Sequence, residues 1–167
     1  MALDRDDIIS VLNDLIETCE DGVKGFRAAA EEVKSGEAKT LFTSRVQLIE
    51  RGAAELQAEV RRLGGDPAKR GSAAGALHRG WINLKSMITG KDDETIIAEC
   101  VRGEDVAVKN YEEALRKDLP ADIRALVERQ YQGTLQNRDL VRALKGVTGG
   151  AASARVREAD RGAPPPV

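Results

Sequence analysis

The chain has 167 residues, of which 32% are charged and 3% aromatic, and its formal net charge is −2. This balance, without a block of Lys or Arg, argues against a general nucleic-acid-binding protein. No apolar run could span a membrane, and the acidic start lacks the basic-then-apolar order of a signal peptide. We therefore expect a cytoplasmic protein of one domain, in which Cys19 and Cys100 are buried thiols rather than a disulfide.

Four stretches of the sequence place apolar residues at alternating steps of three and four, which is the period of one helix face. Short turns join the first stretch to the second and the third to the fourth, so each pair is predicted to form an antiparallel hairpin. The four predicted helices run from about Asp4 to Val33, Lys39 to Leu63, Asp92 to Leu115 and Ala121 to Leu144.

The connection between the two predicted hairpins is long, residues 64–91, and contains a shorter helical stretch from about Ala73 to Ile88. A long crossover between two hairpins is the connection of ferritin-like bundles. The sequence therefore predicts an all-α, ferritin-like four-helix bundle over residues 1–145. Residues 146–167 are rich in Gly, Ala and Pro. We expect them to form a mobile tail, because they cannot bury enough apolar surface to offset their ordering entropy.

An internal repeat supports this architecture. The segment Val23–Phe26 of the first helix matches Val108–Tyr111 of the third, and Val60–Leu63 of the second matches Val141–Leu144 of the fourth. The apolar stripes of the second and fourth helices coincide when the second match is fixed. Each hairpin is thus a rough copy of the other, as expected for two similar halves joined by a crossover.

The sequence lacks the usual ligands of a ferritin-like di-metal site. Such a site takes one Glu from each of two helices and a Glu-x-x-His from each of the other two. No Glu-x-x-His occurs in the chain, and the only histidine, His78, lies in the crossover. We interpret His78 as packing the crossover helix on the bundle rather than as a lone metal ligand. With no nucleophile–base pair either, the sequence favours a protein that is not an enzyme.

Polar residues nevertheless occupy helix positions that face the bundle centre. Glu104 lies in the apolar stripe of the third helix. Three residues lie in the stripe of the fourth helix at similar height: Gln130, Thr134 and Asn137. One interpretation is a polar core layer in which these three side chains hold Glu104 and fix the register of the helices.

The alternative interpretation is a carboxylate-rich site for a divalent cation, Fe, Mn or Zn. Three further glutamates flank the seam, the line along which the helix faces meet at the bundle centre. They lie at roughly the height of Glu104 and could complete such a set: Glu20, Glu55 and Glu59. The polar layer is the preferred interpretation, because imidazole is missing and the amides of Gln and Asn are weak ligands.

Several segments of the chain together resemble a bacterial family: Glu55–Gly65, Gly75–Trp81, Arg102–Asp105 and Tyr111–Leu115. It is a ferritin-like four-helix-bundle family catalogued as a domain of unknown function, and the resemblance covers about Asp7 to Lys145. It implies a ferritin-like fold, a bacterial cytoplasmic home and no established activity. Members often carry a His just before the residue that here is Asp139, and this chain has Arg138 there.

Two hypotheses for function follow from the sequence. The first is a non-enzymatic bundle, with a role in stress as one option. It acts through contacts with a protein partner or through self-association, without a cofactor, nucleic acid or membrane. The second is a metal-binding, ferritin-like protein that uses the glutamate set in place of histidines.

Overall fold

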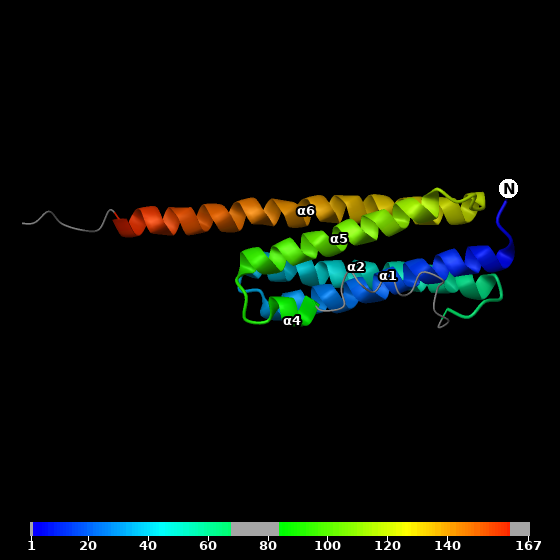
Figure 1. Ribbon diagram of the computed structural model, residues 1–167, viewed down its shortest axis with the longest axis horizontal. Coiled ribbons are helices and arrows are strands. Elements are labelled where there is room, and N and C mark those ends of the chain that lie inside the picture. The colour runs from blue at the N-terminus through cyan, green and yellow to red at the C-terminus, as the bar shows by residue number, and fades with distance from the viewer. Residues whose placement is uncertain (1, 68–83, 161–167) are drawn as a thin grey trace, which may run out of the picture.

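The computed structural model describes the backbone of residues 2–67 and 84–160, and side chains as far as Lys145. Within these residues the chain consists of helices and short connections, with no strand. Figure 1 shows long helices lying side by side as two antiparallel pairs. The all-α fold and the two hairpins are therefore confirmed. The helices are α1 (Arg5–Glu32), α2 (Gly36–Arg62), α4 (Leu84–Ile88), α5 (Asp93–Leu115) and α6 (Ala121–Asp160).

The helices begin where the sequence offers side-chain oxygens to the unpaired amides of a first turn. Asp4 caps α1 and Ser35 caps α2. The predicted cap at the start of the third long helix is confirmed, because the Asp92 carboxylate accepts from the Thr95 main-chain N–H at 2.9 Å. Since Ser35 is the cap, α2 begins at Gly36, three residues before the predicted start.

The end of α2 also follows the sequence. Gly64 has a φ of +80°, a left-handed conformation that glycine adopts without strain. The N–H of Gly65 then donates to the main-chain oxygen of Val60 at 2.9 Å, which satisfies a carbonyl of the last turn.

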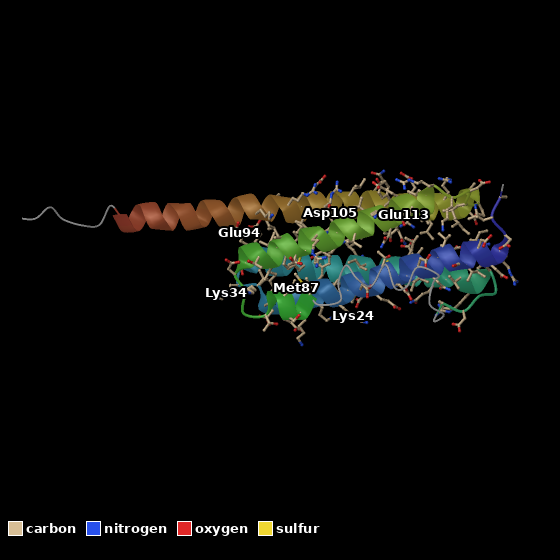
Figure 2. All side chains as sticks on the ribbon, viewed as in Figure 1. Lys24, Lys34, Met87, Glu94, Asp105 and Glu113 are labelled. Atoms are coloured by element: carbon tan, nitrogen blue, oxygen red, sulfur yellow. The ribbon has the colours of Figure 1, made fainter. Side chains whose placement is uncertain are left out.

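Apolar side chains from all the long helices form one continuous core. Phe26 of α1 and Phe42 of α2 are fully buried, and their ring centroids lie 5.6 Å apart in a tilted arrangement. Charged side chains such as Lys24 and Glu113 lie at the outer surface (Figure 2). This division between faces is what the alternating steps of three and four predict.

The two hairpins are tied together at one end of the bundle. Asp93, the first residue of α5, accepts the main-chain N–H groups of Lys34 and Ser35, each at 2.8 Å. These residues form the turn between α1 and α2, so one carboxylate fixes the start of the second hairpin against the first. A charged acceptor also gives both amides stronger hydrogen bonds than a neutral acceptor would.

The crossover and the C-terminal segment are the parts that differ most from the prediction. The observed short helix α4 covers only the last five residues of the predicted Ala73–Ile88 stretch, and residues 68–83, including His78 and Trp81, lie outside the described part.

The predicted end of the fourth helix near Leu144 is wrong, because α6 continues to Asp160 and extends beyond the other helices (Figure 1). Alanine, arginine and glutamate in residues 151–160 favour helix, which accounts for the longer element. The mobility of residues 146–167 stays a prediction, and residues 161–167 are not among those described.

Within the described ranges, no helix is both long and apolar enough to cross a lipid bilayer.

Candidate functional site

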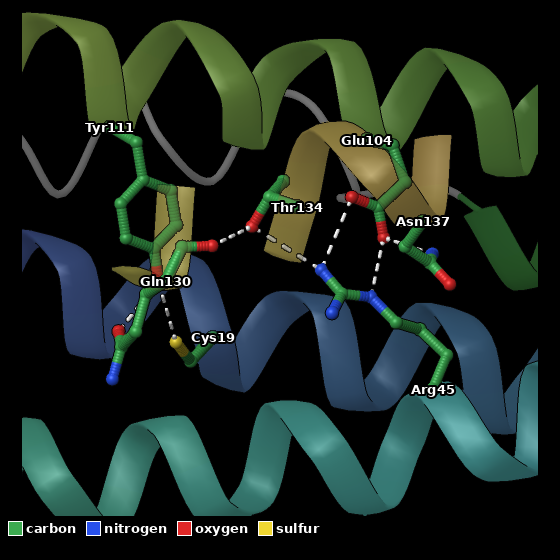
Figure 3. Close-up of polar contacts among 7 residues, drawn as sticks. All are labelled: Cys19, Arg45, Glu104, Tyr111, Gln130, Thr134 and Asn137. Carbon is green, nitrogen blue, oxygen red and sulfur yellow. Dashed lines mark hydrogen bonds and ion pairs between the residues drawn. The ribbon is translucent and has the colours of Figure 1, made fainter. Parts of the chain in front are cut away.

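A buried ion pair between α2 and α5 lies at the centre of the bundle. Arg45 donates from Nε to Glu104 Oε1 at 2.9 Å and from Nη2 to Glu104 Oε2 at 3.3 Å (Figure 3). The Arg45 side chain is 9% exposed and that of Glu104 is 2% exposed. Such a two-point contact matches the planar fork of a guanidinium to the two oxygens of a carboxylate.

Two residues of α6 complete this layer. Asn137 donates from Nδ2 to Glu104 Oε1 at 3.1 Å, and Arg45 Nη2 also donates to Thr134 Oγ1 at 3.4 Å. The Thr134 hydroxyl donates in turn to the main-chain oxygen of Gln130 at 2.9 Å. The layer therefore connects α2, α5 and α6, which lie on different sides of the bundle centre.

Burial controls the chemistry of the central carboxyl. It raises the pKa of Glu104 above its ordinary value, and the Arg45 guanidinium and the Asn137 amide offset part of this effect. The negative charge of Glu104 is thus compensated by a fixed side chain of the protein itself.

A second polar cluster lies one to two helix turns away along the same seam. The Tyr111 hydroxyl donates to Gln130 Oε1 at 3.0 Å and lies 3.6 Å from Cys19 Sγ. Gln130 Nε2 donates to the main-chain oxygen of Gly52 at 3.1 Å. Burial raises the pKa of the Cys19 thiol to about 11 and that of Tyr111 well above its ordinary value. Both groups are therefore protonated at neutral pH and act as hydrogen-bonding groups rather than nucleophiles.

The four residues of the predicted polar layer are divided between these clusters. Asn137 contacts Glu104 directly, whereas Thr134 reaches it through Arg45. Gln130 binds Tyr111 and the backbone of α2 instead.

The glutamates of the alternative metal set do not converge. Arg129 binds Glu55 through its two terminal nitrogens, Nη1 and Nη2, and Arg62 binds Glu59 at 2.7 Å. Glu20 is exposed at the surface of α1. Across the described residues, no three His, Cys, Asp or Glu side chains gather as a metal-binding group would.

Arg45 is the central residue that the sequence analysis missed. It lies three residues after Phe42 and four before Ile49, so it shares the core-facing side of α2 with them. The apolar stripe of α2 also includes Val46, so the core-facing position of Arg45 beside it did not stand out. The signal available in the sequence was an arginine at a core-facing position of one helix, opposite a glutamate at a core-facing position of another.

The arginine at position 138, where family members often carry a histidine, takes part in a separate surface network. Its Nη1 lies 3.5 Å from Asp105 Oδ1, and Arg142 Nη2 lies 3.1 Å from the same oxygen. Both contacts go to Asp105, the residue after Glu104 in α5, rather than to the central pair.

Beside the two polar clusters, a cavity of about 470 Å³ opens between α2 and α6. Its deep end includes Arg45, Glu104 and Tyr111, and Leu48 and Leu140 stand at its edge. These two leucines are 54% and 50% exposed. The cavity therefore connects the buried polar groups to the surface.

The long crossover, the paired hairpins and the polar seam together define a ferritin-like four-helix bundle. The chain is similar to the solved structure of a two-domain protein from Anabaena variabilis with DJ-1/ThiJ/PfpI-like and ferritin-like domains, at 14% identity and a TM-score of 0.73. That match covers 90% of this chain and 39% of the other, so this chain spans well under half of that protein. A ferritin-like, diiron-carboxylate protein from Bacillus anthracis matches at 16% identity and a TM-score of 0.65, over 87% of this chain and 99% of that one.

Residues 7–117, two thirds of the chain, match the sequence profile described as Domain of unknown function (DUF2383), and the chain belongs to this family. No curated protein matches it. At the identities found, the structural matches show the fold alone.

The residues of the seam do not fit a di-iron centre. Such a centre needs several carboxylates and imidazoles on one set of metal ions. Here the one fully buried seam carboxylate that the structure describes, Glu104, uses both of its oxygens to bind Arg45. A guanidinium cannot ligate a metal, because it has no acceptor and stays protonated.

Proposed function

We propose that this chain is a non-enzymatic, ferritin-like bundle that does not depend on a metal ion and acts through contacts between protein molecules. The ion pair between Arg45 and Glu104 carries the proposal. It supplies, from the chain itself, the positive charge that a buried carboxylate requires, so the bundle centre is electrostatically complete without a bound cation.

The two cysteines support a non-catalytic role in a reducing compartment such as the cytoplasm. Cys19 and Cys100 are both free and buried. Burial is the main cause that raises the pKa of each thiol, so neither supplies a thiolate at neutral pH. Free buried thiols without a disulfide are typical of proteins that work in the cytoplasm.

The partner that fits best is a second copy of the chain. A shallow groove of about 560 Å³ runs between the first half of α2 and α6, with Leu41, Leu140 and Leu144 among its lining residues. Leu140 is half exposed there. A two-fold axis across this groove would bury the same apolar surface on both copies, which is how homodimers commonly form.

Sedimentation velocity at several concentrations tests this proposal. We expect a dimer at about 50 µM, a concentration at which a weak, micromolar contact is populated. Leu140→Lys places a charge in the groove and should give a monomer. Ala54→Lys, on an exposed position of the same α2 helix, introduces an equal charge elsewhere and should leave the dimer intact. A wild type that stays monomeric throughout would contradict self-association.

A metal-binding role is the second candidate, because the Bacillus anthracis relative in fold is described as a diiron-carboxylate protein. For this chain, a cation would have to displace Arg45 from Glu104 and draw in Glu20, Glu55 or Glu59. Elemental analysis of protein purified without a chelator or a metal-affinity tag separates the two candidates. About one or two equivalents of Fe, Mn or Zn per chain would favour this second role.

A further inference from the structure

The cavity between α2 and α6 has the size and shape of a small-ligand site. Its volume of about 470 Å³ lies within the range of pockets that hold small organic molecules. Gly133 of α6 also lines the cavity, and a Cβ added there would meet no atom within 4 Å. Phe26, Ile49 and Leu48 contribute apolar walls. The space therefore suits the apolar body of a ligand.

The deep end of this cavity presents an unused hydrogen-bond donor. Glu104 accepts hydrogen bonds from Nε and Nη2 of Arg45, and Thr134 also accepts from Nη2. No described residue accepts from Nη1 (Figure 3). The Arg45 residue is only 8% exposed, and it lines the cavity. A guanidinium held rigidly with one edge free is prepared to bind an anionic or carbonyl oxygen.

The charges around the cavity favour an anion over a neutral molecule. Among the described residues that line it, three are arginines and two are glutamates. Arg45 pairs with Glu104, and Arg129 pairs with Glu55. Arg51 has no acidic partner within the described ranges, so the lining carries one surplus positive charge. One negative charge on a ligand would balance it.

We propose that this cavity binds an amphipathic organic acid, with its carboxylate on Arg45 Nη1 and its apolar body between α2 and α6. Arg51 at the surface balances the added charge and attracts the acid to the opening. Leu48 and Leu140, half exposed in the free protein, cover the apolar body when the ligand is present. The site needs no bound metal ion, and it shares Leu140 with the neighbouring groove.

Isothermal titration calorimetry with octanoate tests the proposal, with octanol as the uncharged analogue of the same chain length. Octanoate should bind one to one, and at least about tenfold more tightly than octanol, because the alcohol lacks the charge that Arg45 and Arg51 recognise. Arg51→Gln should weaken the binding of octanoate about threefold to tenfold and leave the affinity for octanol unchanged. Gly133→Phe should abolish binding of both, because the ring fills the cavity.

Matched controls separate the site from general effects. Gly133→Ala adds only a methyl group and should bind octanoate as the wild type does. Arg61→Gln removes an exposed arginine from the same helix, outside the cavity lining, and should also have no effect. Circular dichroism melting checks that each variant is folded, and the surface variant Arg51→Gln remains a test if Gly133→Phe does not fold. The proposal is overturned by no octanoate binding up to about 1 mM, by equal affinity for octanol, or by unchanged binding in Gly133→Phe.

Discussion

A double-mutant cycle on Arg45 and Glu104 measures how far each charge depends on the other. The side chains are 9% and 2% exposed, so either charge left alone would be largely desolvated. Arg45→Leu should therefore lower the free energy of unfolding by about 3–5 kcal/mol, and Glu104→Leu by a similar or smaller amount, because Thr134 still accepts from Arg45. The double variant replaces both charges by apolar groups, and its stability should lie close to that of the wild type or above it.

The coupling energy from this cycle should thus be at least about 3 kcal/mol, measured by urea unfolding at pH 7. The matched control is the pair Arg27–Glu50, which has the same type of contact at 2.8 Å but side chains 56% and 51% exposed. Its coupling should be no more than about 1 kcal/mol. A central coupling as small as that of the control would refute the argument that Arg45 compensates a buried charge.

Three further predictions concern titration, backbone and thiols. Because burial raises the pKa of Glu104, the stability linked to its protonation is present at acid pH and is lost as pH rises through that raised value. Without its arginine partner the effect should grow, so urea unfolding of Arg45→Leu should show a steeper loss of stability than wild type as pH rises above the ordinary pKa of a glutamate. Gly133→Ala should stabilise the protein by about 1 kcal/mol in thermal melts, because its Cβ meets only open space, whereas Gly64→Ala, at a φ of +80°, should destabilise it by a similar amount. Burial raises the pKa of Cys19 to about 11, so a thiol reagent at pH 8 should label Cys19 in urea but not in the native protein.

Much of the fold could be predicted from the sequence, because the period of the apolar residues and the capping side chains are local signals. The steps of three and four identified the long helices, and Asp92 marked the start of α5. The long crossover distinguished a ferritin-like arrangement from a simple up-and-down bundle. The end of α6 was less predictable, since glycines near residue 150 suggested a tail while the residues after them favour helix.

The candidate site was predicted only in part, because its contacts join residues far apart in the chain. Periodicity placed Glu104 and Asn137 at the bundle centre, where they meet. It did not choose the partners of each polar group. Arginine is usually exposed, so the residue type at position 45 does not indicate burial, although its spacing places it beside the core. Glu55 and Arg129 pair across two helices, a choice that depends on rotamers and helix rotation rather than on spacing.

The melting temperature of the wild-type protein, measured with and without a strong chelator, tests most directly whether the bundle centre is complete without a metal ion. A metal bound only by the folded state would stabilise it, and removing that metal would lower the melting temperature. With the buried charge of Glu104 compensated by Arg45, the two melting curves should coincide within about 1 °C. A chelator-induced drop of several degrees in wild type that disappears in Glu104→Gln would contradict the metal-independent bundle and restore the glutamate set as a metal site.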